Sequence, residues 1–162
     1  MLSLRRFGEG DAILDVLTAA HGRHSGLVKG GASRRMAAAL QPGATLSLEW
    51  RARLDPQLGA FRAEQVRSRA AQLMADGDAL AAFGAAAALL AAFLPEREPA
   101  PALYAATTTL FDRLGAAPDW RAAYVGWELI LLAELGYPLD LGSCGVTGVT
   151  EGLAFVSPKT GR

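Results

Sequence analysis

The chain has 162 residues, of which 51% are hydrophobic and 20% charged, so it can form a packed core and is not expected to be disordered. Its single cysteine, Cys144, excludes a framework of internal disulfides and fits a reducing compartment. The formal net charge is zero, which taken alone suggests no nucleic-acid partner.

The charges are unevenly distributed along the chain. Residues 1–75 hold eleven Lys and Arg against six Asp and Glu, whereas residues 76–162 hold five against ten. This asymmetry predicts a basic working surface on the first half. It also predicts that the two halves attract each other.

The first half has the two-residue period of β-strands. In residues 44–54, Leu46, Leu48 and Trp50 face one way and polar residues the other, which predicts one buried and one solvated face. Strands are expected at Leu2–Phe7, Ala12–Thr18, Gly26–Lys29, Ala44–Leu54 and Ala60–Val66. Five short strands match an OB-fold barrel. A five-stranded SH3-like barrel has the same count, so the pattern leaves both open.

The second half has the period of helices. Three helices are expected, over residues 76–94, 99–115 and 118–136, each bounded by Asp or Pro at its start and by Pro or Gly at its end. The third carries an apolar stripe of Trp120, Tyr124, Trp127 and Leu131. The uncharged run 79–94 is too short to span a bilayer comfortably and is interpreted as a buried helix. Near the end of the chain, Leu153–Val156 predicts a short strand.

The stretch from His21 to Arg35, HGRHSGLVKGGASRR, combines positive side chains with glycines. Arginines supply forked donors for phosphate oxygens, and glycines let the backbone approach closely. Arg23, Lys29, Arg34 and Arg35 are therefore candidate phosphate contacts. The alternative is a solvated loop whose charges have no ligand. The spacing of a phosphate-binding Walker loop is absent, so nucleotide hydrolysis has no support.

Arg51 and Arg53 lie on the polar face of the alternating strand. If that face belongs to the same barrel, they join Arg5, Arg6 and the glycine-rich loop in one basic track. The alternative is that these arginines only keep the strand soluble. Aromatic residues that could stack on bases are scarce in this half, so recognition should depend on phosphates, with little sequence preference and a strong salt dependence.

Catalytic and metal-binding patterns are weak. His21 and His24 are three residues apart without a clustered pair of carboxylates, and we interpret them as turn or surface histidines. Cys144 and Thr147 have the C-x2-C spacing found in zinc sites, but Thr147 stands where the second sulfur would be. The sequence therefore predicts no catalytic residues, no metal and no cofactor.

Several runs of residues resemble the RecO family of recombination mediators, in its alphaproteobacterial form. In the first half these are GEGDAIL (Gly8–Leu14), HGR (His21–Arg23), GLVKGGASRR (Gly26–Arg35) and WRARL (Trp50–Leu54). In the second half they are LPEREPxPALY (Leu94–Tyr104), YVxWELxLLAELGYPLDL (Tyr124–Leu141) and CxVTGxTExLAFVSPKTGR (Cys144–Arg162). The similarity extends over nearly the whole chain.

The resemblance implies an α+β protein. Residues 1–75 would form a five-stranded OB-fold β-barrel that binds nucleic acid. Residues 76–162 would form a helical domain with a short β-hairpin-like segment. Family members continue with further helical sequence, so this domain is expected to be incomplete and the chain truncated at its C-terminal end. Many relatives carry a four-cysteine zinc site there; with Thr147 in place of a second cysteine, no zinc is expected.

The resemblance also implies a function in DNA repair and recombination. RecO proteins bind single- and double-stranded DNA, anneal complementary strands and help to load RecA. They contact RecR and the C-terminal tail of single-stranded DNA-binding protein. The implied location is the bacterial cytoplasm at the nucleoid, with no membrane partner. The DNA contacts carry over onto Arg5, Arg6, Arg23, Lys29, Arg34, Arg35, Arg51 and Arg53.

Two other classes of function stay open beside this one. The chain would be a protein-interaction adaptor if the acidic helical half does the work and the barrel only stabilises it. It would be an enzyme, for example a nuclease, if a cluster of acid, base or metal-binding groups formed. No such cluster is visible in the sequence.

Overall fold

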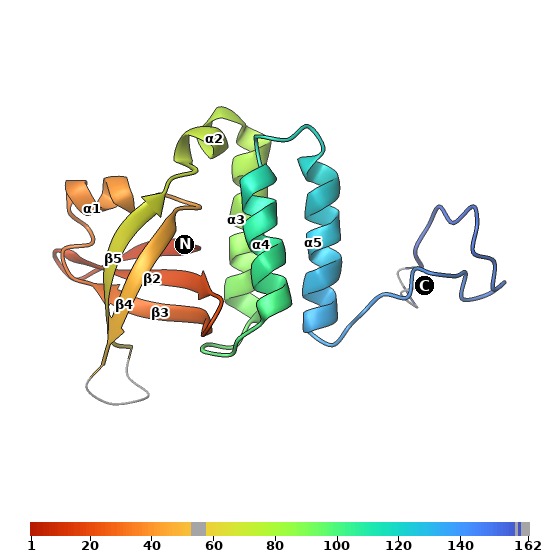
Figure 1. Cartoon of the computed structure of the whole chain (residues 1–162), viewed down its shortest axis with the longest axis horizontal. Coiled ribbons are helices and arrows are strands. Elements are labelled where there is room, and N and C mark those ends of the chain that lie inside the picture. The colour runs from red at the N-terminus through yellow and green to blue at the C-terminus, as the bar shows by residue number, and fades with distance from the viewer. Residues whose placement is uncertain (53–57, 158, 160–162) are drawn as a thin grey trace.

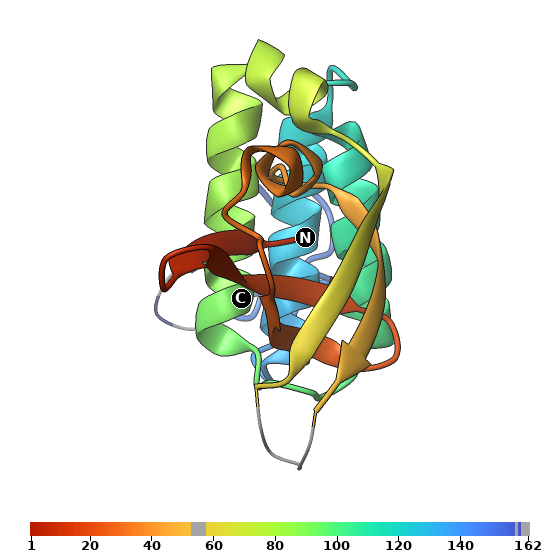
Figure 2. The same cartoon turned by 90° about the vertical axis from the view of Figure 1, so that its left-hand side faces the viewer.

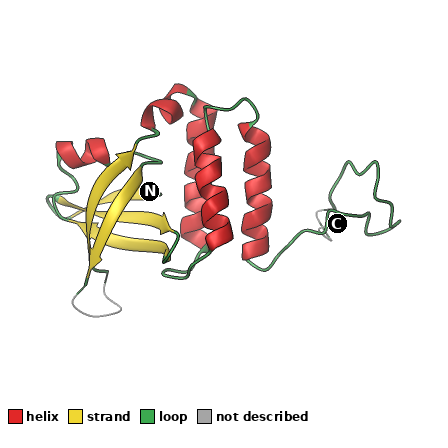
Figure 3. Cartoon of the chain, in the orientation of Figure 1, coloured by secondary structure: helices red, strands yellow, loops and turns green. Residues whose placement is uncertain are grey.

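The computed structural model describes residues 1–52, 58–157 and 159. It confirms the α+β class: a five-stranded N-terminal sheet is followed by a layer of helices (Figure 3). All five predicted strands are present: β1 (Ser3–Phe7), β2 (Asp11–Thr18), β3 (Gly22–Val28), β4 (Thr45–Arg51) and β5 (Ala60–Arg67). The predicted residues Arg53 and Leu54 lie outside the described residues.

The strands are ordered β1-β2-β3-β5-β4, and only β3 and β5 run parallel. A short helix, α1 (Arg34–Ala39), joins β3 to β4. Figure 2 looks at the sheet from the side away from the long helices and shows α1 in front of it. This arrangement is OB-fold-like, so it favours the OB fold over the SH3-like barrel, which the strand count alone had left open.

The sheet is not closed, which corrects the predicted barrel. In the described part of the chain no strand pairing joins β1 to β4, the two edges of the sheet. β1 has five residues and pairs only with the first part of β2, ending at Asp15, so it is too short to run along β4. The edges are linked instead by one hydrogen bond ahead of β4, from the amine of Met1 to the carbonyl of Ala44 at 2.8 Å.

The interior of the open barrel is apolar. Its buried residues are Leu14, Val16, Val28, Leu40 and Phe61. The predicted alternation in β4 is confirmed: Leu46, Leu48 and Trp50 pack against this cluster, while the residues between them are exposed. Trp50 is half-buried rather than fully buried, because β4 is an edge strand.

The three predicted long helices are also confirmed, as α3 (Gly77–Phe93), α4 (Pro101–Arg113) and α5 (Trp120–Glu134) (Figure 1). Asp76 caps α3 by accepting hydrogen bonds from the backbone amides of Asp78 and Ala79. A short helix that the sequence analysis did not predict, α2 (Ala70–Ala75), precedes α3. No helix among the described residues is long and apolar enough to cross a membrane.

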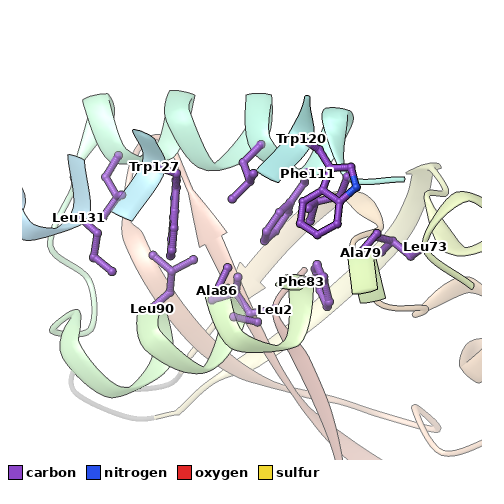
Figure 4. Close-up of a cluster of buried hydrophobic side chains, with 14 of the residues drawn as sticks. Leu2, Leu73, Ala79, Phe83, Ala86, Leu90, Phe111, Trp120, Trp127 and Leu131 are labelled. Atoms are coloured by element: carbon purple, nitrogen blue, oxygen red, sulfur yellow. The ribbon is translucent and has the colours of Figure 1, made fainter. Parts of the chain in front are cut away.

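The helices enclose a second apolar core, shown in Figure 4 between α3 on one side and α4 and α5 on the other. The predicted stripe on α5 faces it: Trp120, Trp127 and Leu131 are buried, and Tyr124 packs beside them. Leu2, which lies just before β1, is buried in the same cluster. The sheet and the helices therefore share part of one core.

Ion pairs also join the two halves, as the charge asymmetry predicted. Arg69 is 5% exposed, and its Nε donates to Oδ1 of Asp112 on α4 at 2.7 Å. The same guanidinium donates to the carbonyl of Gly43 and the hydroxyl of Thr45, which fixes the start of β4. Arg67 reaches the same Asp112 oxygen at 2.8 Å. Two basic residues of the first half thus form ion pairs with one acidic residue of the second half.

After α5 the chain leaves the helices as an extended segment (Figure 1). Cys144 and Val149 are joined by a backbone hydrogen bond of 2.8 Å that closes a turn. The strand predicted at Leu153–Val156 is wrong, because those residues form no strand in the described part of the chain. Phe155 is 95% exposed, so this segment lacks the packing that a strand needs.

Candidate nucleic-acid interface

The outer face of the sheet gathers several of the predicted basic residues. In the strand register, Arg5 lies opposite Ile13, which lies opposite Leu27. Leu27 pairs with Ala60 of β5, and Ala60 lies opposite Arg51 of β4. Residues directly opposite each other project to the same face of a sheet. One row across the sheet therefore ends in Arg5 on one edge and Arg51 on the other.

The adjacent row adds two more positive side chains. Because Leu27 pairs with Ala60 in parallel, Lys29 leaves β3 at the level of Arg62 on β5. Both side chains are exposed, and Arg62 was not among the residues that the sequence analysis selected. Its position in an alternating strand with a solvated face is a signal that could have found it.

Lys29 begins the predicted loop, which the structure holds in place. Gly30 has a φ of 66°, and its amide donates to Oδ1 of Asp11 at 2.8 Å. The amide of Ala32 donates to the carbonyl of Gly10 at 3.1 Å. A Cβ on Gly31 would lie 2.8 Å from that of Ala12, so the loop needs glycine there. Asp11 therefore shapes the loop.

Arg34 and Arg35 belong to helix α1, whereas the sequence analysis interpreted them as part of a loop. The hydroxyl of Ser33 caps this helix by accepting from the amide of Met36 at 3.4 Å. A side-chain cap of this kind lets a helix begin immediately after a glycine-rich turn. Both arginines are exposed and form no ion pair within the described residues.

Arg6 is exposed on β1 beside Arg5 but on the opposite side of the strand, opposite Ala12. Arg5, Arg6 and Lys29 likewise form no ion pair within the described residues. Arg51 lies 3.9 Å from Glu49, and Arg62 lies 3.3 Å from Glu64. These two pairs are well exposed and therefore weak. Arg53 lies outside the described residues.

Arg23 has a different environment from the other predicted contacts. Its side chain is 18% exposed, and Nη1 lies 3.6 Å from Asp15 and 3.7 Å from Glu96. Nε donates to the carbonyl of Leu94 at 2.9 Å. Burial raises the pKa of the Asp15 carboxyl, and the nearby guanidinium of Arg23 opposes that rise. The structure thus uses Arg23 to join the sheet to the end of α3.

His24 is not the turn or surface residue that the sequence analysis expected. It is 5% exposed, and its ring centroid lies 5.1 Å from those of both Trp50 and Phe61. Burial lowers its pKa, and the positive charge of Arg97 lowers it further. Nε2 has no hydrogen-bond partner within the described part of the chain. His21, by contrast, lies in the exposed turn between β2 and β3.

The residues do not fit a zinc site. Cys144 is the only cysteine in the sequence, and among the described residues no group of three or more His, Cys, Asp or Glu could hold a metal. The amide of Thr147 lies 3.5 Å from the Cys144 sulfur. Hydrogen bonds from Thr147 lower the pKa of this thiol to about 7.

Three basic residues, Lys29, Arg51 and Arg62, border a groove of about 440 Å³. Met36 of α1 and the buried Phe61 also line it. The groove thus connects the end of β3, the two strands β4 and β5, and α1. Arg5 and Arg6 lie at the other edge of the sheet, so the structure brings the predicted residues to one sheet in two groups.

Comparison with known proteins identifies the family. The family model described as "Recombination protein O N terminal" matches residues 1–69, and "Recombination protein O C terminal" matches residues 74–162. The chain is 53% identical to the DNA repair protein RecO of Ruegeria sp. and 55% identical to that of Cereibacter sphaeroides. Each alignment covers all of this chain and 67% of the relative. The chain therefore belongs to the RecO family of DNA repair proteins.

Proposed function

We propose that this chain is a DNA-binding recombination mediator whose working surface combines the basic outer side of the sheet, both sides of the edge strand β1, and α1. The observation that carries the proposal is a set of exposed positive side chains without ion pairs in the described part of the chain: Arg5, Arg6, Lys29, Arg34 and Arg35. Unpaired positive charge can neutralise phosphates and release their counterions.

Arg51 and Arg62 extend this surface along the groove. Arg53 stays in the proposed set on its sequence position alone. We leave Arg23 out of it, because its guanidinium is largely buried and already lies close to two carboxylates and one carbonyl. Releasing it to a phosphate would leave Asp15 without its positive partner in a buried position, which is costly.

We extend the proposal to finer roles, which membership of the family supports. The chain would bind single- and double-stranded DNA and anneal complementary strands. It would bind the C-terminal tail of single-stranded DNA-binding protein. It would act with RecR to promote RecA loading. Its site of action would be the nucleoid in the cytoplasm. None of these roles requires catalysis or a cofactor.

The test is fluorescence anisotropy of labelled single- and double-stranded oligonucleotides at several salt concentrations. We expect steeply salt-dependent binding to many sequences. Arg34→Ala with Arg35→Ala should lower the slope of log K against log salt by about one or two units. The matched control is Arg121→Ala, because Arg121 is an exposed arginine on α5 that is paired with Asp78. An unchanged slope in the double variant would remove α1 from the interface.

An adaptor role is the second candidate, and one feature of the helical half favours it. An apolar groove of about 290 Å³ lies between α4 and α5, lined by Ala106, Ala123, Trp127 and Ile130 among others. Ile130 is 40% exposed there. In this role, partner binding would survive the Arg34→Ala, Arg35→Ala variant and DNA binding would be absent at low salt.

A further inference from the structure

The connection between α3 and α4 is joined to strand β3 by hydrogen bonds. The amide of Arg97 donates to the carbonyl of Arg23 at 2.7 Å, and Nε of Arg23 donates to the carbonyl of Leu94 at 2.9 Å. Gly22, with a φ of 58°, permits this approach, because a Cβ there would overlap the carbonyl oxygen of Glu98. The contact links the sheet directly to the helices.

Four polar side chains form a cluster at this contact: Asp15, Arg23, Ser25 and Glu96. Asp15 of β2 lies opposite Ser25 of β3, so the two side chains project to the same face of the sheet. The hydroxyl oxygen of Ser25 lies 3.2 Å from Oδ1 of Asp15 and 2.6 Å from Oε1 of Glu96. Nη1 of Arg23 lies 3.6 Å from Asp15 and 3.7 Å from Glu96. One hydroxyl and one guanidinium thus stand between two carboxyl groups.

The hydrogen bonds of Ser25 require a further proton in the cluster. A serine hydroxyl has one proton, so it can donate to only one of the two carboxyl oxygens. The shorter contact, of 2.6 Å to Glu96, has the length of a hydroxyl-to-carboxylate hydrogen bond. The Asp15 oxygen is then hydrogen-bonded only if it carries a proton and donates it to the Ser25 oxygen. That proton also balances the charge, because two carboxylates beside one guanidinium would leave one negative charge in excess.

The surroundings of the two carboxyl groups favour this proton. Burial raises the pKa of Asp15, Arg23 and the Ser25 hydroxyl oppose the rise, and the negative charge of Glu96 adds to it. The side chain of Asp15 is 13% exposed and that of Glu96 is 43% exposed, so Asp15 is the member that loses more hydration.

Three further titratable or charged groups act on the pair. The amine of Met1, ahead of β1, interacts with Asp15, but burial lowers the pKa of this amine to about 5, so it carries little charge at pH 7. Glu96 interacts with the ring of His24, whose pKa is lowered by burial, so that ring is neutral above about pH 6.5. Arg97 is positive throughout, and its guanidinium lies 4.7 Å from the centre of an aromatic ring.

We propose that Asp15 and Glu96 share one proton in the folded protein, and that loss of this proton loosens the α3–α4 connection from β3. Two negative charges would then face one guanidinium, and Glu96 is the more exposed partner that can turn to water. The folded pair binds the proton more tightly than the unfolded chain does. Its stabilising effect is therefore complete below about pH 3.8, the ordinary pKa of Asp, and is lost as the pH rises through the raised pKa of the pair.

The first experiment follows the carboxyl carbon of Asp15 by NMR as the pH is changed, using the unmodified protein. We expect its titration midpoint to lie above pH 3.8, and a midpoint at or below that value would overturn the proposal. Glu96→Gln should move the midpoint to lower pH, because it removes the negative charge that favours the proton. An unchanged midpoint would show that burial acts alone and would overturn the sharing.

The second experiment compares urea unfolding of the natural protein and Asp15→Asn between pH 4 and pH 8. The amide of Asn donates a hydrogen bond at every pH, so the variant keeps the contact that Asp15 loses. The unfolding midpoint of the variant, relative to that of the natural protein, should rise with pH. The matched control is Asp78→Asn, an exposed partner of Arg121, for which this difference should not rise. A constant or falling difference for Asp15→Asn would show an ordinary ion pair with Arg23 and overturn the proposal.

The third experiment measures loosening of the connection itself. Hydrogen exchange of the Arg97 amide, corrected for the intrinsic effect of pH, should become faster in the natural protein as the proton is lost and should stay slow in Asp15→Asn. Corrected exchange that does not change with pH would overturn the link between the proton and the connection. The NMR titration uses the unmodified protein, so it decides the question even if Asp15→Asn does not fold. DNA takes part in none of these measurements, so their outcome does not depend on the proposed function.

Discussion

Trp127 is the centre of the helical core, and its replacement by alanine tests the packing of that core most directly. The side chain is 2% exposed on α5, and its ring centroid lies 5.7 Å from that of Tyr124. Its indole Nε1 donates to the hydroxyl of Thr107 on α4 at 2.8 Å. Thr107 is itself 3% exposed, so the hydrogen bond is shielded from water.

The expected loss of stability has two parts. Removing a buried Trp side chain costs about 3–5 kcal/mol, because the surrounding helices collapse only partly into the space. Within that loss, the buried hydroxyl of Thr107 is left without its indole donor, which accounts for about 1 kcal/mol. Domains of this kind have a total stability of about 5–15 kcal/mol, so Trp127→Ala should remove a large share of it. The melting temperature should fall by about 10 °C or more.

The assay is thermal and urea unfolding followed by circular dichroism. The matched control is Val125→Ala on the same helix, because Val125 is 56% exposed and should change stability by no more than about 0.5 kcal/mol. A double-mutant cycle of Trp127→Phe and Thr107→Val should give a coupling energy of about 0.5–3 kcal/mol. Unchanged melting of Trp127→Ala would refute the packing described for α5, and zero coupling would refute the hydrogen bond.

Two further predictions concern the sheet and its contact with the helices. Burial holds the pKa of His24 below its ordinary value of 6.5, so the unfolded chain binds the proton more readily. The stability from the neutral ring is therefore complete above about pH 6.5 and is lost as the pH falls below it. Urea unfolding at pH 7.5 and pH 5 should show a larger loss for the natural protein than for His24→Phe; an equal loss would contradict the assignment. Asp112→Ala leaves the buried guanidinium of Arg69 without its carboxylate and should cost about 1–3 kcal/mol, less than for a fully buried pair because Asp112 is 38% exposed. The control Glu64→Ala, which removes an exposed partner of Arg62, should lower the free energy of unfolding by less than about 1 kcal/mol. Equal losses in the two variants would show that the pair of Arg69 and Asp112 does not stabilise the contact between the sheet and the helices.

Helix α1 shows what local sequence patterns miss. Lys29–Arg35 is predicted from the sequence to be one glycine-rich loop, in which glycines and positive side chains occur together. In the structure the loop ends at Ser33, and the six-residue helix α1 begins at Arg34. So short a helix shows less than two turns of periodicity, and an isolated helix of that length is not stable by itself. Its stability comes from contacts with the barrel, such as that of Met36 with the interior cluster.

Arg23 and His24 show a second limit of prediction from the sequence. In the sequence they stand beside glycines and other polar residues and resemble a solvated turn. Their burial results from partners far along the chain: Glu96 for Arg23, and Trp50 and Phe61 for His24. Charge and polarity can be read from a residue, but the partner that compensates its burial cannot.

The local patterns of the sequence determined the strands, the three long helices and the division into a basic and an acidic half. Period-two and helical alternation are properties of neighbouring residues, and capping Asp and terminal Pro act within one turn. Which basic residues stay free for a ligand was decided only by the tertiary structure. Arg51 lies on the same row as Arg5 because β3 pairs with β5, which is far from it in the sequence. Arg23 is not available to a ligand because it forms an ion pair with Glu96. Strand register and long-range ion pairs are properties of the folded chain, since they depend on residues that no local window contains.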